Sequence, residues 1–159
     1  MLYLCMGIFA AAAVILDQLT KWLVVKNIEL GAHIPAIKGI FSLTHTRNTG
    51  AAFSSFEGMQ WLFALVFLLF AAAIIWEFSK KRWPFSTFDR WCIVAVFAGG
   101  LGNMIDRIRL GYVVDMIEVD FVEFAVFNVA DCFITCGCIA LMVSLIFFNK
   151  DFWKDEKKA

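Results

Sequence analysis

The sequence predicts an all-α membrane protein with four transmembrane helices, and two observations lead to this fold class. Hydrophobic residues make up 62% of the 159 residues and charged residues only 18%, against about 45–50% and about 25% in soluble domains. A globule of this size could not bury so much apolar surface in water. Four segments also approach the roughly 20 apolar residues that a helix needs to cross a hydrocarbon core.

We expect a single integral-membrane domain over residues 1–159, with spans at about 2–25, 58–78, 89–108 and 127–149. Outer loops are expected at about 26–57 and 109–126. A helix in a soluble bundle would carry a polar face, and the second and fourth spans carry almost none. The first span has no basic start and no clear cleavage point, so we interpret it as an uncleaved helix.

Basic residues predict the orientation of the spans. Lys and Arg occur eight times in the link between spans two and three and in the C-terminal tail, and five times on the opposite side. Short cytoplasmic loops are enriched in these residues, so we expect both termini to be cytoplasmic. The chain carries 14 basic and 14 acidic residues, and this balance argues against a nucleic-acid partner.

The first outer loop contains a candidate strand. Residues 41–46 alternate apolar and polar side chains, which is typical of a strand with one face on an apolar surface. Pro35, Gly39 and Gly50 are interpreted as turn residues around a short strand pair lying on the membrane. The second outer loop, at 110–126, is rich in the valine and isoleucine that favour strands.

Metal-binding patterns are not found in the sequence. The five cysteines all fall in predicted spans, and their spacing does not resemble a zinc site. His33 and His45 have no third ligand at a suitable spacing. We therefore expect no metal.

Several polar residues lie within or at the edge of the predicted spans, where they are costly. Asp17 and Lys21 are four residues apart, so they share a helix face, and we interpret them as a structural ion pair. Asp106 has Arg107 beside it and Arg109 nearby, so we expect its affinity for protons to be lowered and its role to be structural.

Asp115 and Asp131 are the acidic residues whose ionisation is hardest to justify structurally. Asp131 has no basic neighbour in sequence, and Asp115 stands between two valines and a Met-Ile pair. Asn103 and Asn128 are expected to form hydrogen bonds across helices. If the two aspartates meet, they would share one proton, as the carboxyl pair of an aspartic protease does. The residues alone leave open a small proton-coupled transporter or a lipid-handling subunit.

Four sequence blocks resemble those of the lipoprotein signal peptidases, the signal peptidase II family, in the order of that family. They are DQLTK at 17–21, TRNTGAAF at 46–53, GGLGNMIDR at 99–107 continuing to GYVVD at 111–115, and FNVAD at 127–131. A single block would be a weak signal, whereas the ordered set covers the chain from the first span to the last. The resemblance implies four membrane helices, a small extracytoplasmic β-cradle, and an outer loop or helix over the site.

The resemblance also implies the activity. The chain would be an aspartic endopeptidase of the bacterial cytoplasmic (inner) membrane, with its active site toward the outer face. It would cleave prolipoproteins before the diacylglyceryl-modified cysteine, with Asp115 and Asp131 as the catalytic pair and no metal or organic cofactor. Its expected partners are lipid-modified prolipoprotein signal peptides and membrane lipid, and we expect a monomer. Further residues match positions with structural or substrate-contacting roles: Asp17, Lys21, Asn48, Gly50, Asn103, Asp106, Arg107, Asn128 and Ala130.

Overall fold

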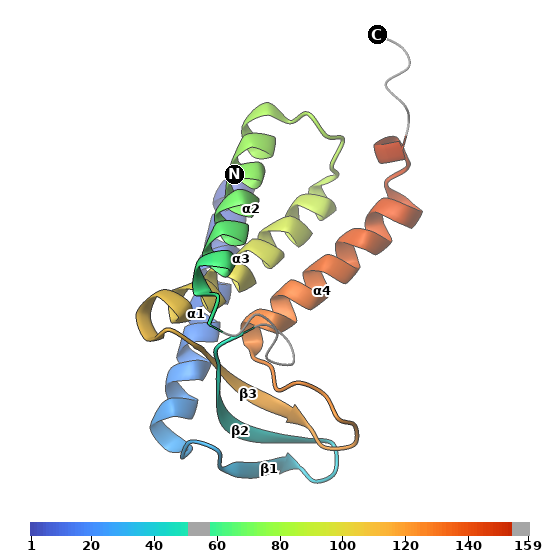
Figure 1. Ribbon diagram of the computed structural model, residues 1–159. Helices are drawn as coiled ribbons and strands as arrows, with labels where there is room; N and C mark the ends of the chain where they lie inside the picture. The colour runs from blue at the N-terminus through green and yellow to red at the C-terminus, as the bar shows by residue number, and fades with distance from the viewer. Residues whose placement is uncertain (51–57, 154–159) are drawn as a thin grey trace.

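The computed structural model describes residues 1–50 and 58–153, so part of the predicted first outer loop and the end of the tail lie outside the described residues. Four long helices dominate these ranges (Figure 1): α1 (Leu2–Asn27), α2 (Gln60–Lys80), α3 (Thr87–Leu110) and α4 (Val129–Val143). Helix α4 continues as a π-helix over Ser144–Phe148, and a 3₁₀ turn covers Lys150–Trp153. Within the described ranges, four helical segments are long and apolar enough to cross a membrane, as the predicted fold class requires.

A small antiparallel sheet packs at one end of the helices (Figure 1), with strands β1 (His33–Ile37), β2 (Phe41–Asn48) and β3 (Val113–Val119) in that order. Gly39 occupies the predicted turn between the first two strands, with a φ of 76°. The interpretation of Pro35 as a turn residue is wrong, because it lies within β1. An edge strand tolerates proline, since one of its sides needs no N–H donor.

The opposite end of the molecule gathers the start of α1, the link between α2 and α3, and the end of α4 (Figure 1). The ring of Tyr3 lies 5.8 Å from that of Phe78, and Arg90 donates to the Tyr3 hydroxyl at 3.2 Å. The rings of Trp83 and Phe152 stack at 5.8 Å. This is the arrangement that four crossings of a membrane require.

Helix α3 is the central helix, and it packs closely against α4. A Cβ atom at Gly99 would collide with the carbonyl oxygen of Ala130, and one at Gly102 would lie 2.5 Å from an Asp17 carboxylate oxygen. A larger residue at either point would therefore force its neighbours to shift. The close approach brings the N-terminus of α4 against the middle of α3, beside the buried charge of α1.

The start of α3 is fixed by a buried polar cluster that the sequence analysis did not single out. Asp89 accepts hydrogen bonds from the Ser86 backbone at 2.8 Å and from the Asn149 side chain at 2.7 Å, and it is fully buried. Ser86 in turn accepts from the Asp89 backbone, which completes a capping box. These bonds attach the end of the α4 segment to the start of α3.

Candidate active site

Asp115 lies in β3 and is 2% exposed. Val114 is buried in a core cluster with Val24 and Ile28. Because side chains alternate along a strand, Val113 and Asp115 face the other side, where both line the cavity. Asn48, at the end of β2, donates to one carboxylate oxygen of Asp115 at 2.9 Å. Asn128 donates to the other oxygen at 2.6 Å. Both oxygens are therefore held in a fixed orientation.

Asp131 is held by the N-terminus of its own helix. Asn128 is the N-cap of α4, and its side chain accepts from the Asp131 backbone at 3.0 Å. One carboxylate oxygen of Asp131 accepts from the Asn128 backbone at 3.0 Å. The other accepts from the Asn103 side chain on α3 at 2.8 Å. The carboxylate is thus part of a capping box and also reaches across to the neighbouring helix.

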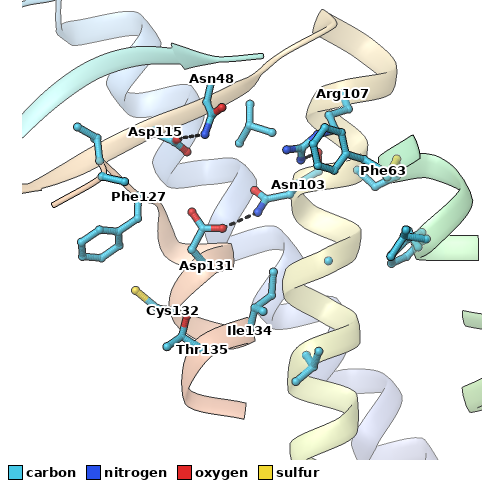
Figure 2. A pocket seen from close by; sticks show the side chains of 18 of the residues that line it. Asn48, Phe63, Asn103, Arg107, Asp115, Phe127, Asp131, Cys132, Ile134 and Thr135 are labelled. Carbon is cyan, nitrogen blue, oxygen red and sulfur yellow. Dashed lines mark hydrogen bonds between the residues drawn. The ribbon is translucent and has the colours of Figure 1, made fainter. Parts of the chain in front are cut away.

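The two aspartates face one cavity of about 810 Å³ between α2, α3 and α4 (Figure 2). The predicted hydrogen bond between Asn128 and Asn103 is present at 3.1 Å. Asn128 also contacts Asp115, so a single asparagine side chain connects the environments of both aspartates. The carboxyl groups of Asp115, from a strand, and Asp131, from a helix, therefore line the same polar part of the cavity.

The surroundings of Asp115 make its protonated form easier to populate than that of an aspartate in water. Burial, which penalises the charged carboxylate, raises its pKa to about 6. Hydrogen bonds from Asn48 and Asn128 oppose the rise, whereas the negative charge of Asp131 adds to it. A carboxyl group with this pKa can hold or release a proton near neutral pH.

Lys21 organises a buried ion network beside this cavity. Its ammonium lies 2.9 Å from Asp17 and 3.1 Å from Asp106, and it donates to Asn103 at 2.9 Å. The predicted Asp17–Lys21 pair is confirmed. Asp106 forms its ion pair with Lys21 of α1 and not with the adjacent Arg107, because neighbouring residues of a helix point in different directions.

Arg107 instead fastens the end of β2 to α3. It donates to the carbonyl oxygen of Gly50 at 2.8 Å, and its guanidinium lies 4.3 Å from the centre of the Phe63 ring. The Gly50 backbone donates to the Asn48 side chain at 2.9 Å. Arg107 and Gly50 thereby support the asparagine that holds Asp115.

Ala130 and Gln18 connect α1 to the site. The Ala130 backbone donates to Asp17 at 3.0 Å, and its methyl group is completely buried. Gln18, which sequence reasoning missed as a functional candidate, donates to Asp106 at 2.9 Å and to the carbonyl oxygen of Gly102 at 3.2 Å. The sequence feature that could have identified Gln18 is its position next to Asp17 in an otherwise apolar helix.

The rest of the cavity is apolar and lies along the helices. Its walls include side chains of α2, such as Phe63, Val66 and Phe67, and Ile134 of α4. Over residues 1–50 and 58–153, no group of three His, Cys, Asp or Glu residues is arranged to hold a metal ion. The arrangement thus combines a long apolar surface with a pair of carboxyl groups suited to acid–base chemistry.

Comparisons with known proteins agree with the resemblance noted in the sequence. Residues 9–147 match the family model for signal peptidase (SPase) II. The chain is 45% identical over 141 residues to a lipoprotein signal peptidase of Streptococcus agalactiae serotype Ia, covering 89% of this chain and 86% of that protein. It is 42% identical over 143 residues to a lipoprotein signal peptidase of Streptococcus pyogenes serotype M1, covering 90% and 89%.

Two solved structures, each described as a bacterial membrane enzyme studied by the in meso method, have the same fold. The first has a TM-score of 0.85 at 30% identity and covers 98% of this chain and 94% of its own. The second has a TM-score of 0.81 at 31% identity and covers 91% and 94%. Together with the four apolar helices, these matches show that the chain is a multi-pass membrane protein. It belongs to the signal peptidase II family of peptidases.

Proposed function

We propose that this protein is an intramembrane aspartic endopeptidase that removes signal peptides from prolipoproteins by cleaving before the diacylglyceryl-modified cysteine. One observation carries the proposal: the buried carboxyl group of Asp115 and the partly buried carboxyl group of Asp131 face a single cavity and are connected through Asn128. Membership of the signal peptidase II family supports the reaction class and the substrate. The acid–base roles below follow from the hydrogen bonds and the charge environment.

In the proposed reaction, Asp131 acts as the base and Asp115 as the acid. Asp131 takes a proton from a water molecule as the water oxygen attacks the scissile carbonyl carbon, while Asp115 donates its proton to the carbonyl oxygen. The tetrahedral intermediate then collapses: the carbon–nitrogen bond breaks as Asp131 passes its proton to the leaving nitrogen, and Asp115 takes a proton back from a hydroxyl of the intermediate as the carboxyl product forms. A pKa of about 6 leaves a fraction of Asp115 protonated near neutral pH, and this fraction can start the reaction as the proton donor.

The other polar residues have supporting roles in this proposal. Asn48, Asn103 and Asn128 orient the two carboxyl groups, and they also make the site polar enough to hold water. The ion network of Asp17, Lys21 and Asp106 supports Asn103 from the other side. Gly50, Arg107 and Ala130 fix the surrounding backbone, and no metal or organic cofactor takes part.

The apolar walls of the cavity support an apolar substrate segment. A signal peptide that is lipid-modified already lies in the bilayer, so its cleavage site arrives at the depth of the cavity. We place the sheet end toward the outer face of a bacterial cytoplasmic membrane and both termini in the cytoplasm. The cluster of basic residues at 80–82 lies at the end opposite the sheet, as this orientation requires. We assign membrane lipid as a partner and a monomer as the working unit.

Two substitutions test the proposal, Asp115→Asn and Asp131→Asn. Each is expected to lower turnover by about 10²–10⁴-fold, the range associated with general acid–base catalysis, while the protein still accumulates in the membrane. The assay incubates purified protein in detergent with a diacylglyceryl-modified prolipoprotein and follows the shortened product on a gel. Glu29→Gln, an exposed acid outside the cavity, is the control. Near-normal turnover by either variant would contradict the pairing, and a transporter would give no product at all.

A further inference from the structure

A second cavity, of about 850 Å³, adjoins the first beside the sheet. We call it the outer cleft; the end of β2, the strand β3 and residues 119–126 line it. Asn48, Asp115 and residues 124–126 line both cavities. Asp115 therefore lies at the junction between an apolar cavity and a polar one, and a chain bound across it would enter both.

We propose that the outer cleft binds the polypeptide that follows the modified cysteine and selects for basic residues there. This inference rests on the proposed function, because it concerns the substrate of the same site. An endopeptidase must hold its substrate on both sides of the scissile bond. The apolar cavity suits the signal peptide, so the segment on the other side of the bond, which leaves the membrane, has the outer cleft as its path.

The charges of the outer cleft are mainly negative. Besides Asp115, its lining includes Glu118, Asp120 and Glu123, against Arg47 as its basic residue. The guanidinium of Arg47 lies over the ring of Tyr112, 4.8 Å from its centre. A cleft lined by one sign of charge concentrates the field inside it and attracts the opposite sign. Lysine or arginine after the cysteine would meet this field, and an acidic residue would be repelled.

The acidic residues are held in place by the sheet and its neighbours. Glu118 lies in β3 opposite Ser42 and is 3.0 Å from the His33 imidazole. The Asp120 backbone donates to the carbonyl oxygen of Ile40 at 3.0 Å, which fixes the start of the 119–126 segment. Near its end, the ring of Phe124 packs edge-on against that of Phe127 at 6.0 Å. The segment is anchored at both ends, so its charges have defined positions.

The experiment uses three forms of one diacylglyceryl-modified prolipoprotein, with Lys, Gln or Glu at the second to fourth positions after the cysteine. Values of kcat/KM are measured with the full-length protein in detergent at low salt. We expect the Lys form to be cleaved about fivefold faster than the Gln form and the Glu form more slowly still, in line with about 1 kcal/mol for partly exposed charge pairs. The preference should shrink near 1 M salt, where the Debye length falls to about 3 Å.

Variants of the exposed acids assign the effect to the cleft. Asp120→Lys and Glu123→Lys should each reduce the preference for the Lys substrate, and the double variant should reverse it. Glu29→Lys, which makes the same charge change on an exposed residue outside the cleft, should leave the preference intact. Equal cleavage of all three substrates, or a preference unaffected by the cleft variants, would overturn this inference and leave the proposed function standing. Failure to cleave any of them would overturn the proposed function itself.

Discussion

Replacing Asn48 with alanine should move the pH dependence of catalysis. The Asn48 amide donates to a carboxylate oxygen of Asp115 at 2.9 Å, and this bond holds the pKa of Asp115 below the value that burial alone would produce. A hydrogen bond to a charged group contributes about 1.5–3 kcal/mol. One pKa unit corresponds to about 1.36 kcal/mol. Without the amide, Asp115 should keep its proton to a pH about one to two units higher.

The assay is a profile of kcat/KM against pH for the parent protein and Asn48→Ala. In the proposed mechanism, its alkaline limb reports loss of the last proton from the interacting carboxyl pair. We expect this limb to shift toward higher pH in the variant, even though the maximal rate falls because Asp115 is less well oriented. Asn27→Ala, which removes an exposed asparagine at the end of α1, should leave the profile unchanged. A limb that stays in place or moves to lower pH would refute the reasoning.

Two further substitutions probe the scaffold, with unfolding followed in detergent. Lys21→Met should lower the free energy of unfolding by about 3–5 kcal/mol, because it leaves two buried carboxylates without their cation. Lys26→Met, on the exposed part of the same helix, should have little effect, and equal losses in the two variants would contradict the network's role. Gly99→Ala should cost about 1–3 kcal/mol and slow cleavage, since its Cβ would strike a backbone carbonyl of α4. Gly7→Ala meets nothing within 4 Å, so an equal loss there would show that helix crowding is not the cause.

The four helices were predictable because each is defined by a continuous apolar run, a property of the local sequence. The strand at 41–46 was visible for a similar reason, since its side chains alternate. A second strand was expected beside it but was not located at residues 33–37, because HIPAI does not alternate polar and apolar residues. Pro35 is compatible both with a turn and with an edge strand. The pairing of β1 with β2 shows that it lies in a strand.

The candidate site was partly predictable for a related reason. Asp115 and Asp131 could be singled out because each lacks a basic neighbour in sequence, and this is a local property. The partner of Asp106 could not be found in this way, because Lys21 reaches it from another helix and the adjacent Arg107 turns elsewhere. The contact between Asn48 and Asp115 likewise depends on the register of β2 and β3.

The ion pair within α1 has a consequence for how the protein is made. The ribosome delivers α1 before α3, so Asp17 and Lys21 reach the bilayer when Asp106 and Asn103 have not yet been synthesised. An isolated charge at the centre of a helix costs about 2.5–3.5 kcal/mol to insert. Because the two opposite charges are one helical turn apart, α1 carries its own counter-ion during biogenesis. When α3 is inserted later, Lys21 also pairs with Asp106 and donates to Asn103. The helix that is inserted first therefore supplies the cation for the buried polar groups of α3.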